Sequence, residues 1–478
     1  MATNDLDLYY RTATELIAAF EKKDLSPVEV TRALIDRSQS VNEKLNVLTY
    51  TFYDRALAEA KRAEAAYASA AKARTLRPLE GITVAIKDFH SLAGEITTYG
   101  SKIFENFRPE KSAPTVDRLL DAGAIVLSRT TTPEFAHSGV TKSPLWGVSR
   151  NPWNTEWSCG GSSGGAGAAV AAGMVTVADG TDGGGSIRIP SCVNGLFGYK
   201  PPFGRNPLDY EHPMETLLHY GPIVRSVADG ALLQNVMSGP HPADICSLRE
   251  KVVIPDPATL QGIKGWKVAV SMDLGYFEVD HEVQKNTREA ADVFRSLGCE
   301  VEEVDVGWNR GTYDAWLTTW EGLFAGIAEQ YLPRWRYEMS PFVVKILDAG
   351  RQHGAARFYR CNQVRGEMYW KLAPILDTHQ ILICPTTATP GIRAEHQDDA
   401  ADFTINGKPA FAYLDWAMTY PFNLLSQCPV ANLPSGFGKN GIPTGIQVVA
   451  KTYDDLTIFR AAAAYEQARP WRQHRPRI

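Results

Sequence analysis

The chain of 478 residues carries a formal net charge of −5, and 44% of its residues are hydrophobic and 22% charged. These values are ordinary for a soluble globular enzyme, and the net negative charge gives no electrostatic reason to expect nucleic acid or an anionic membrane as a partner. The seven cysteines are scattered, odd in number and without a C-x-x-C pair, which favours neither a disulfide framework nor a zinc site. Without a secretory signal pattern or a run of about 18 apolar residues, the sequence predicts a cytoplasmic protein.

The first 75 residues are expected to form a layer of helices without catalytic chemistry. Apolar residues recur at helical spacing over residues 12–22 and 27–38, and Ser26 with Glu29 has the S-x-x-E form of a capping box. Residues 53–73, rich in Ala, Glu, Lys and Arg, predict a third helix that faces solvent.

A buried strand is predicted at residues 81–88, GITVAIKD, and it ends on Lys87 and Asp88. A helix over 115–122 and a strand over 124–128 follow, and this alternation is typical of an α/β core. A lysine at the end of a strand is usually a solvated charge. Lys87 follows an apolar run, however, and desolvation would lower its pKa and make it available as a base.

Two glycine-dense turns that carry serines dominate the next stretch. They are GGSSGG at 160–165 and GGGS at 183–186, separated by a small-residue helix over 166–172 and a buried strand over 174–178. Such a density of glycine implies unusual dihedral angles or a backbone approach too close for a Cβ. The arrangement would aim a helix N-terminus and several N–H groups at one point, which suits a developing negative charge beside the serines.

The rest of the chain returns to an α/β rhythm after a section, about residues 203–262, that we expect to be rich in loops. Strands are expected at 267–271, 300–306, 381–385 and 445–450, and helices at 282–297 and 454–467. No internal repeat or Ser/Gly linker marks a domain boundary.

Aromatic side chains are concentrated in residues 308–337. An aromatic stripe at helical spacing is core packing by default. The alternative is the wall of a pocket for an apolar ligand, since ligand sites are mostly apolar with a few polar anchors. Under that alternative the candidate pocket residues are Trp316, Trp320 and Phe324.

The segment GGSSG at 160–164 formally fits G-x-S-x-G, the nucleophile elbow of α/β-hydrolases. That motif needs a buried strand immediately before its serine, and residues 151–158 are polar and contain proline. A phosphate-binding loop is also disfavoured, because neither GxxxxGK[ST] nor a well-placed GxGxxG is present. The histidines of the loop-rich section are expected at the surface: His212, His219 and His241.

Three linked motifs resemble the amidase signature family of Ser-Ser-Lys hydrolases. They are GITVAIKD with Lys87, GGSSGGAGAAVAAG with Ser162, and GTDGGGSIRIPS with Ser186, and the two serines stand 24 residues apart, as the family requires. The likeness extends over nearly the whole chain through RNPWN at 150–154, GYKP at 198–201, PFN at 421–423 and GIQVV at 445–449.

The chain departs from the family pattern at two positions. Cys159 stands where the family usually has proline, and Pro202 where it usually has threonine or a similar residue. Neither position is one of the three catalytic residues. Cys159 is expected to be a small buried side chain rather than a reactive thiol.

The resemblance implies a single α/β/α domain over residues 1–478, built on a large mixed sheet flanked by helices. Within it we expect an N-terminal helical layer at 1–75, a catalytic core at 76–205 and a variable helical region around the substrate pocket at about 308–375.

The resemblance also implies a role for each matched residue. Ser186 would attack the amide carbonyl and form an acyl-enzyme, Ser162 would follow a cis peptide bond and relay the proton, and Lys87 would be the terminal base. The oxyanion hole would consist of the N–H groups of Gly183, Gly184, Gly185 and Ser186. The supporting residues would be Ser163 within the hydrogen-bond network, and Asp182 and Arg188 as a structural ion pair.

The expected substrate is a small-molecule amide, and the aromatic segment favours an apolar or aryl acyl group. The resemblance implies no cofactor or metal ion, no nucleic-acid or membrane partner, and a possible homodimer. One alternative is the glutaminase subunit of a tRNA-dependent amidotransferase, although that subunit typically follows its nucleophile with Ile-Arg-Gln-Pro, where this chain has IRIP at 187–190. Another is a hydrolase of hydrazides or nylon-type oligomers from the same family. Retention of all three catalytic residues disfavours a non-catalytic binding protein.

Overall fold

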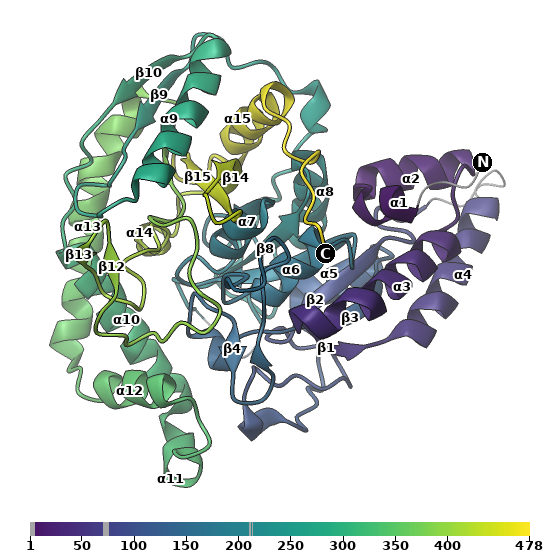
Figure 1. Ribbon diagram of the computed structural model, residues 1–478, viewed down its shortest axis with the longest axis horizontal. Coiled ribbons are helices and arrows are strands. Elements are labelled where there is room, and N and C mark those ends of the chain that lie inside the picture. Colours follow the sequence, from purple (N-terminus) through teal and green to yellow (C-terminus); the bar gives the residue numbers. More distant parts are fainter. Residues whose placement is uncertain (1–4, 70–75, 210–211, 213) are drawn as a thin grey trace.

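The computed structural model describes residues 5–69, 76–209, 212 and 214–478, and a single mixed sheet of eleven strands runs through it (Figure 1). This sheet with its flanking helices is the α/β class that the sequence predicts. In spatial order the strands are β1 (Leu48–Thr51), β3 (Ile125–Thr130), β2 (Thr83–Lys87), β6 (Val177–Asp182), β8 (His219–Val224), β7 (Phe197–Lys200), β14 (Val430–Phe437), β15 (Pro443–Val449), β11 (Ile381–Pro385), β9 (Lys267–Val270) and β10 (Glu300–Glu303). Two small hairpins pair β4 (Lys142–Ser143) with β5 (Gly147–Val148) and β12 (Thr404–Ile405) with β13 (Lys408–Pro409).

The chemistry-bearing residues come together because β3, β2 and β6 are parallel neighbours. Parallel strands place their carboxyl ends at the same edge of the sheet, so Lys87 at the end of β2 lies close to the residues at the end of β6. β8 then runs antiparallel to β6, with His219 opposite Asp182. This edge is the site described below.

Helices cover both faces of the sheet. Alternate residues of β2 enter different cores: Val84 and Ile86 pack in one cluster and Ala85 in another, so neither face of this strand meets solvent. The helices after the N-terminal layer are α5 (Pro114–Asp121), α6 (Gly164–Ala171), α7 (Arg188–Asn194), α8 (Val227–Met237), α9 (His281–Ser296), α10 (Gly311–Ala328), α11 (Leu332–Trp335), α12 (Pro341–Gly350), α13 (Ala355–Thr378), α14 (Pro421–Leu424) and α15 (Asp455–Ala468), with short turns η2 (Lys102–Phe104), η3 (Glu134–Ala136), η4 (Pro257–Thr259) and η5 (Glu329–Tyr331).

The N-terminal layer contains four described helices, and they lie beside the β1–β3 end of the sheet (Figure 1). They are α1 (Asp5–Tyr10), α2 (Ala13–Lys22), α3 (Pro27–Leu45) and α4 (Tyr53–Ser69). The predicted helices are confirmed, except that residues 70–73 of the third lie outside the described residues and its alanine-rich face is buried. Ser26 caps α3 by accepting from Val28 N–H, whereas the reciprocal capping box forms at Thr12 and Glu15.

Two predictions about the middle of the chain are wrong. The expected strand at 174–178 is displaced to Val177–Asp182, because β6 continues into DGTD, which hydrophobicity does not mark as strand. The expected loop-rich section contains β8 and α8. The sequence does not predict β8 because the strand contains Gly221 and Pro222, and proline is rare in a central strand.

The helix α6 (Gly164–Ala171) is completely buried against the sheet, as its small side chains predict. A Cβ on Gly165 would lie 2.5 Å from the backbone nitrogen of Thr131, so only glycine permits this approach. Across the described residues, no helix is both long and apolar enough to cross a membrane.

Candidate active site

The amine of Lys87 is fully buried at the carboxyl end of β2 and donates two hydrogen bonds. Nζ lies 2.7 Å from Ser162 Oγ and 2.7 Å from Thr181 Oγ1. Burial lowers the pKa of the Lys87 amine well below its ordinary value, against the opposing influence of the Asp179 and Asp182 charges. A lysine in this environment tends to be neutral and can accept a proton. Thr181 was not among the residues that the sequence singled out.

Ser162 precedes α6, and the Gly161–Ser162 peptide bond is cis, as the resemblance implies. The next residue, Ser163, connects the two glycine turns: its N–H donates to Ser186 O at 3.3 Å. Its hydroxyl also accepts from Thr181 N–H at 3.2 Å. Ser163 therefore joins the turn that carries Ser162 to the end of β6 and to the second turn.

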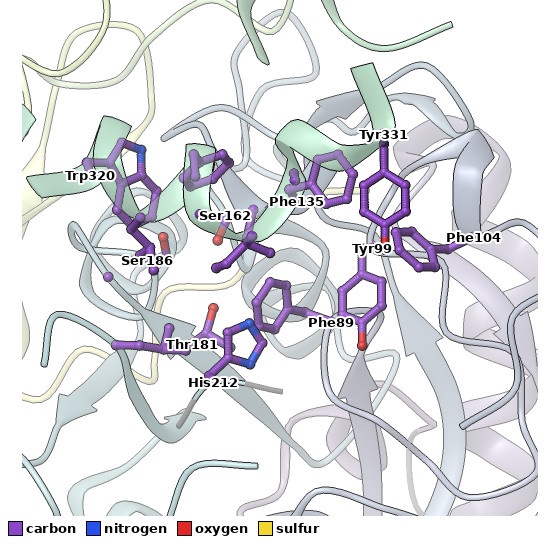
Figure 2. Close-up of a pocket in the computed structure, with 18 of the residues that line it drawn as sticks. Phe89, Tyr99, Phe104, Phe135, Ser162, Thr181, Ser186, His212, Trp320 and Tyr331 are labelled. Atoms are coloured by element: carbon purple, nitrogen blue, oxygen red, sulfur yellow. The ribbon is translucent and has the colours of Figure 1, made fainter. Parts of the chain in front are cut away.

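Ser162 and Ser186 both line a cavity of about 540 Å³ (Figure 2). Ser186 is 8% exposed, whereas Ser162 and Lys87 have no exposure. Ser186 is thus the more accessible serine for a molecule in the cavity, and Ser162 connects the cavity to the Lys87 amine. The two serines and the lysine that the sequence selected are brought together at one end of the sheet.

The carbonyl groups of the glycine turn at 183–186 are all held by hydrogen bonds. Gly183 O accepts from Trp316 Nε1 at 3.2 Å, Gly184 O from Thr419 Oγ1 at 2.5 Å, and Gly185 O from Ile189 N–H at 2.7 Å, while Ser186 O accepts from Ser163. The N–H groups of these four residues have no acceptor among the residues that the structure describes. The turn is therefore fixed through its acceptors, and its donors are left available.

A buried ion pair anchors the start of this turn. Asp182 accepts from Arg188 Nε at 2.9 Å and Nη2 at 2.8 Å, and neither side chain is exposed. Burial alone would raise the pKa of the Asp182 carboxyl, but the Arg188 guanidinium and a hydrogen bond from Asn423 outweigh it and hold the pKa below its usual range. Arg188 also donates to Gln447 Oε1 at 2.6 Å, which ties the turn to β15.

Aromatic residues from two parts of the chain line the cavity. Trp320 and Phe324 of α10 line it, as expected, whereas Trp316 is not among the lining residues and packs against the glycine turn instead. Tyr331, from the aromatic segment 308–337 that the sequence indicates as a possible pocket wall, also lines the cavity. The aromatic lining side chains that sequence reasoning missed are Phe89, Tyr99, Phe104, Phe107 and Phe135. None of the described lining residues is an Asp, Glu, Lys or Arg.

The histidines near the site differ from the expectation of surface positions. His219 lies on β8 and is buried, and burial together with the Lys200 charge lowers its pKa to about 3. His212 is half-buried, lines the cavity and is hydrogen-bonded through Nδ1 to Asp209 at 2.8 Å. Cys159 has no exposure, and burial raises the pKa of its thiol to about 12, so it is a poor nucleophile.

The fold and the site together define an α/β enzyme whose buried lysine is hydrogen-bonded to a serine beside a glycine-framed second serine. A family model described as Amidase matches residues 29–459. The chain is 33% identical to an acylamidase of Rhodococcus erythropolis, with 98% of both chains covered. It is 31% identical to a subunit of the glutamyl-tRNA(Gln) amidotransferase of Thermosynechococcus vestitus, over 97% of this chain and 99% of that one.

Two solved structures extend these similarities to the fold. A bacterial aryl acylamidase of the amidase signature family superimposes with a TM-score of 0.90 at 29% identity, covering 98% of both chains. A 6-aminohexanoate cyclic dimer hydrolase complexed with substrate gives a TM-score of 0.86 at 28% identity, covering 98% of this chain and 99% of that one. The chain belongs to the amidase signature family, and it is an amidohydrolase that acts on amide C–N bonds.

Proposed function

We propose that this amidase hydrolyses uncharged amides with an apolar, preferably aryl, acyl group through an acyl-enzyme on Ser186. The observation that carries the proposal is the Lys87–Ser162 hydrogen bond at an aromatic cavity that both Ser162 and Ser186 line. The similarity to an acylamidase and to an aryl acylamidase supports the same substrate class.

In the proposed reaction Ser186 Oγ attacks the carbonyl carbon of the amide. Its proton passes to Ser162 as the proton of Ser162 passes to the neutral amine of Lys87. When the tetrahedral intermediate collapses, the C–N bond breaks and the same proton returns through Ser162 to the departing amine. A water molecule then attacks the Ser186 ester by the same proton path and releases the carboxylic acid.

The negative charge on the carbonyl oxygen requires fixed donors during this reaction. The N–H groups of Gly183, Gly184, Gly185 and Ser186 are the proposed donors, since their carbonyls are all engaged and the N–H groups have no acceptor among the described residues. One such donor typically contributes roughly 3–4 kcal/mol to the transition state. The Asp182–Arg188 ion pair is proposed to hold the turn rather than to touch the substrate.

The lining of the cavity supports a neutral substrate. Free glutamine carries an ammonium and a carboxylate, and burying either without a partner costs several kcal/mol. None of the described lining residues supplies an opposite charge. This favours the aryl amide over the glutaminase of an amidotransferase, although an amidotransferase subunit is among the relatives. Cyclic amides of the 6-aminohexanoate type are uncharged and remain a second candidate, on the similarity to their hydrolase.

A trapped acyl-enzyme tests the proposal. The purified chain is mixed with an anilide of benzoic acid, quenched in acid and digested, and the peptide that contains Ser186 is weighed. We expect a mass increase equal to the benzoyl group less one hydrogen atom, on Ser186 alone. A label on another residue, or unchanged turnover by Ser186→Ala, would exclude the mechanism.

A substrate panel tests the acyl preference separately. It contains benzanilide, acetanilide, a hydrazide, the 6-aminohexanoate cyclic dimer and glutamine, all at equal concentration. We expect the highest kcat/KM for the aryl acyl group and none detectable for glutamine. Preference for glutamine would assign the chain to the amidotransferase group instead.

A further inference from the structure

A second buried carboxylate adjoins Lys87, and the proposed reaction does not use it. Asp179 lies two residues before Thr181 on β6, so both side chains point to the same face of that strand. Thr181 meets the Lys87 amine on this face. Asp179 has no exposure and does not line the cavity, so it cannot touch a substrate there.

The carboxylate of Asp179 bridges the backbone of Lys87 to a histidine. Its Oδ1 accepts from Lys87 N–H at 2.7 Å. The paired register of β2 with β6 ends two residues earlier, at Ala85 and Ala178, so the Asp179 side chain continues the contact between the strands. Its Oδ2 is hydrogen-bonded to His90 Nδ1. An ionised carboxylate can only accept, so with Asp179 in that form Nδ1 would be the nitrogen that carries the hydrogen.

His90 closes the turn that follows Lys87. Its N–H donates to Lys87 O at 3.1 Å, its ring is fully buried, and the edge of the ring packs against Tyr220 with centroids 4.2 Å apart. Arg129 donates to Lys87 O at 3.1 Å and to His90 O at 2.7 Å, which holds the same turn from β3. The Lys87 backbone is thus clamped from β6, from β3 and from its own turn.

We propose that Asp179 and His90 are positioning residues that fix Lys87 against Ser162 and set the basicity of its amine. The inference rests on the proposed role of Lys87 as the base. Neither residue belongs to the motifs that carry the family resemblance, and neither reaches the substrate. Their proposed effect on the reaction passes through Lys87.

The negative charge on Asp179 predicts the direction in which the pKa of the Lys87 amine changes when that charge is removed. Burial lowers the pKa of the Lys87 amine, and the Asp179 carboxylate, followed by that of Asp182, raises it. The other charged groups around the turn are Arg129, which pairs with Asp88, and Arg188, which pairs with Asp182. Removing the Asp179 charge should make Lys87 easier to deprotonate.

The experiment uses the pH dependence of kcat/KM for an aryl amide. Because Lys87 acts when neutral, kcat/KM rises with pH. The midpoint of this rise follows the pKa of the Lys87 amine. In Asp179→Asn the side-chain oxygen can still accept from Lys87 N–H but the charge is gone, and we expect the midpoint to fall by about 1 pH unit. Asp179→Ala also loses the acceptor, and we expect kcat to fall about 100-fold with an unchanged KM.

Asp229→Asn is the matched control. Asp229 is equally buried and accepts from two backbone N–H groups, those of Ala13 and Thr14 at 2.9 and 3.0 Å, but it is not among the groups that influence Lys87. We expect lower stability with an unchanged midpoint. An unmoved midpoint in Asp179→Asn, or an equal shift in Asp229→Asn, would overturn the role of Asp179.

His90 is tested by a pair of substitutions. Asn places a donor near the position of Nδ1, and Leu does not, so His90→Asn should retain several-fold more kcat than His90→Leu. Equal kcat in the two variants would overturn the role of His90. Wild-type activity in Lys87→Ala would instead remove Lys87 as the base and with it the proposed function, so the two failures are distinguishable.

Discussion

The glycine-framed centre and the helical wall opposite it differ in how much freedom their residues have. Every residue from 159 to 191 is buried, and the carbonyls of the second glycine turn are all engaged. Along α10, buried residues alternate with half-buried and exposed ones, and glycines such as Gly326 adjoin open space. The centre therefore tolerates little change, whereas the wall can vary in shape without disturbing the sheet.

We therefore expect the centre to determine the catalytic rate and the wall to determine which amides are preferred. In the proposed mechanism the centre supplies the nucleophile, the base and the oxyanion donors, which hydrolysis of any amide needs. The wall supplies aromatic surface, which decides the amides that fit. Substitutions in the centre should lower kcat for all substrates, and those in the wall should change the ranking of substrates.

The largest expected effect is that of Ser186→Ala. Removing the proposed nucleophile should lower kcat by on the order of 10⁵-fold for every amide, because the Ser162 hydroxyl, which also lines the cavity, is engaged by the Lys87 amine and is the proposed proton relay. Stopped assays with benzanilide and acetanilide measure the loss, and thermal unfolding checks that the variant is folded. Near-normal turnover by a folded variant would contradict the assignment.

The same glycine-to-alanine change should have opposite outcomes in the two regions. At Gly185, φ is +131° and a Cβ would lie 2.0 Å from Thr419 Oγ1, so alanine must displace the turn. We expect Gly185→Ala to lower kcat by about 10²–10³-fold, the cost of a misplaced oxyanion donor.

Gly326 is the matched position in the wall. It lies within α10 and lines the cavity, and a Cβ there would meet nothing within 4 Å. Gly326→Ala should keep kcat within about twofold and raise the free energy of unfolding by about 0.5–1 kcal/mol. Equal losses of kcat in Gly185→Ala and Gly326→Ala would contradict the view that the centre tolerates less change than the wall.

A smaller effect is expected from Phe324→Ala, because it changes binding and leaves the chemistry intact. Phe324 lines the cavity, and its ring lies 4.8 Å from that of Trp320. The ratio of kcat/KM for benzanilide to that for acetanilide should fall about 10-fold. This ratio does not depend on the active fraction of the enzyme. Phe358→Ala, at an exposed position outside the cavity, is the control and should leave the ratio unchanged.

The two regions also differ in what their sequence predicts. The glycine-dense turns predict an unusual local backbone geometry beside two serines, because the dihedral angles that glycine permits are local. The selection of Ser162, Ser186 and Lys87 depends on the family resemblance, since a lysine at the end of a strand is usually a solvated charge. The wall combines α10 with Phe89, Tyr99 and Phe104 from the connection between β2 and α5. Contacts between segments so far apart depend on the packing of the whole sheet, which periodicity does not encode.

The sequence-based predictions also fail at two single residues, Thr181 and Trp316, and each failure has a local cause. The sequence does not predict a role for Thr181, because β6 extends through a polar stretch, DGTD, that hydrophobicity does not mark as a strand. Once β6 is known to include this stretch, Thr181 and Asp179 lie on the same face of the strand, which is the face that meets Lys87. The prediction that Trp316 lines the cavity is wrong, because the aromatic spacing of α10 does not say which face of the helix meets the ligand. Its indole instead holds Gly183 O, so one helix serves both the wall and the centre.

The last prediction concerns stability rather than activity, at Lys200, a second buried lysine, which ends β7. It donates to the carbonyls of Pro201, Ser426 and Cys428, and burial followed by the Arg188 charge lowers its pKa to about 7. The unfolded chain keeps an ordinary lysine pKa of about 10.4, so between pH 7 and 10 the unfolded state binds one more proton than the folded state. Stability from this group therefore rises with pH across that window, by about 1.4 kcal/mol per unit, and is lost as pH falls towards 7.

Lys200→Met removes this dependence while Lys87 contributes equally to both proteins. The difference in unfolding free energy between wild type and Lys200→Met, measured with urea at a series of pH values, should thus change by about 1.4 kcal/mol per pH unit between about 7 and 10 in favour of the wild type at high pH. Parallel curves would mean that Lys200 stays charged when folded. The centre would then hold a buried cation beside Arg188, and the three carbonyls would have to stabilise it.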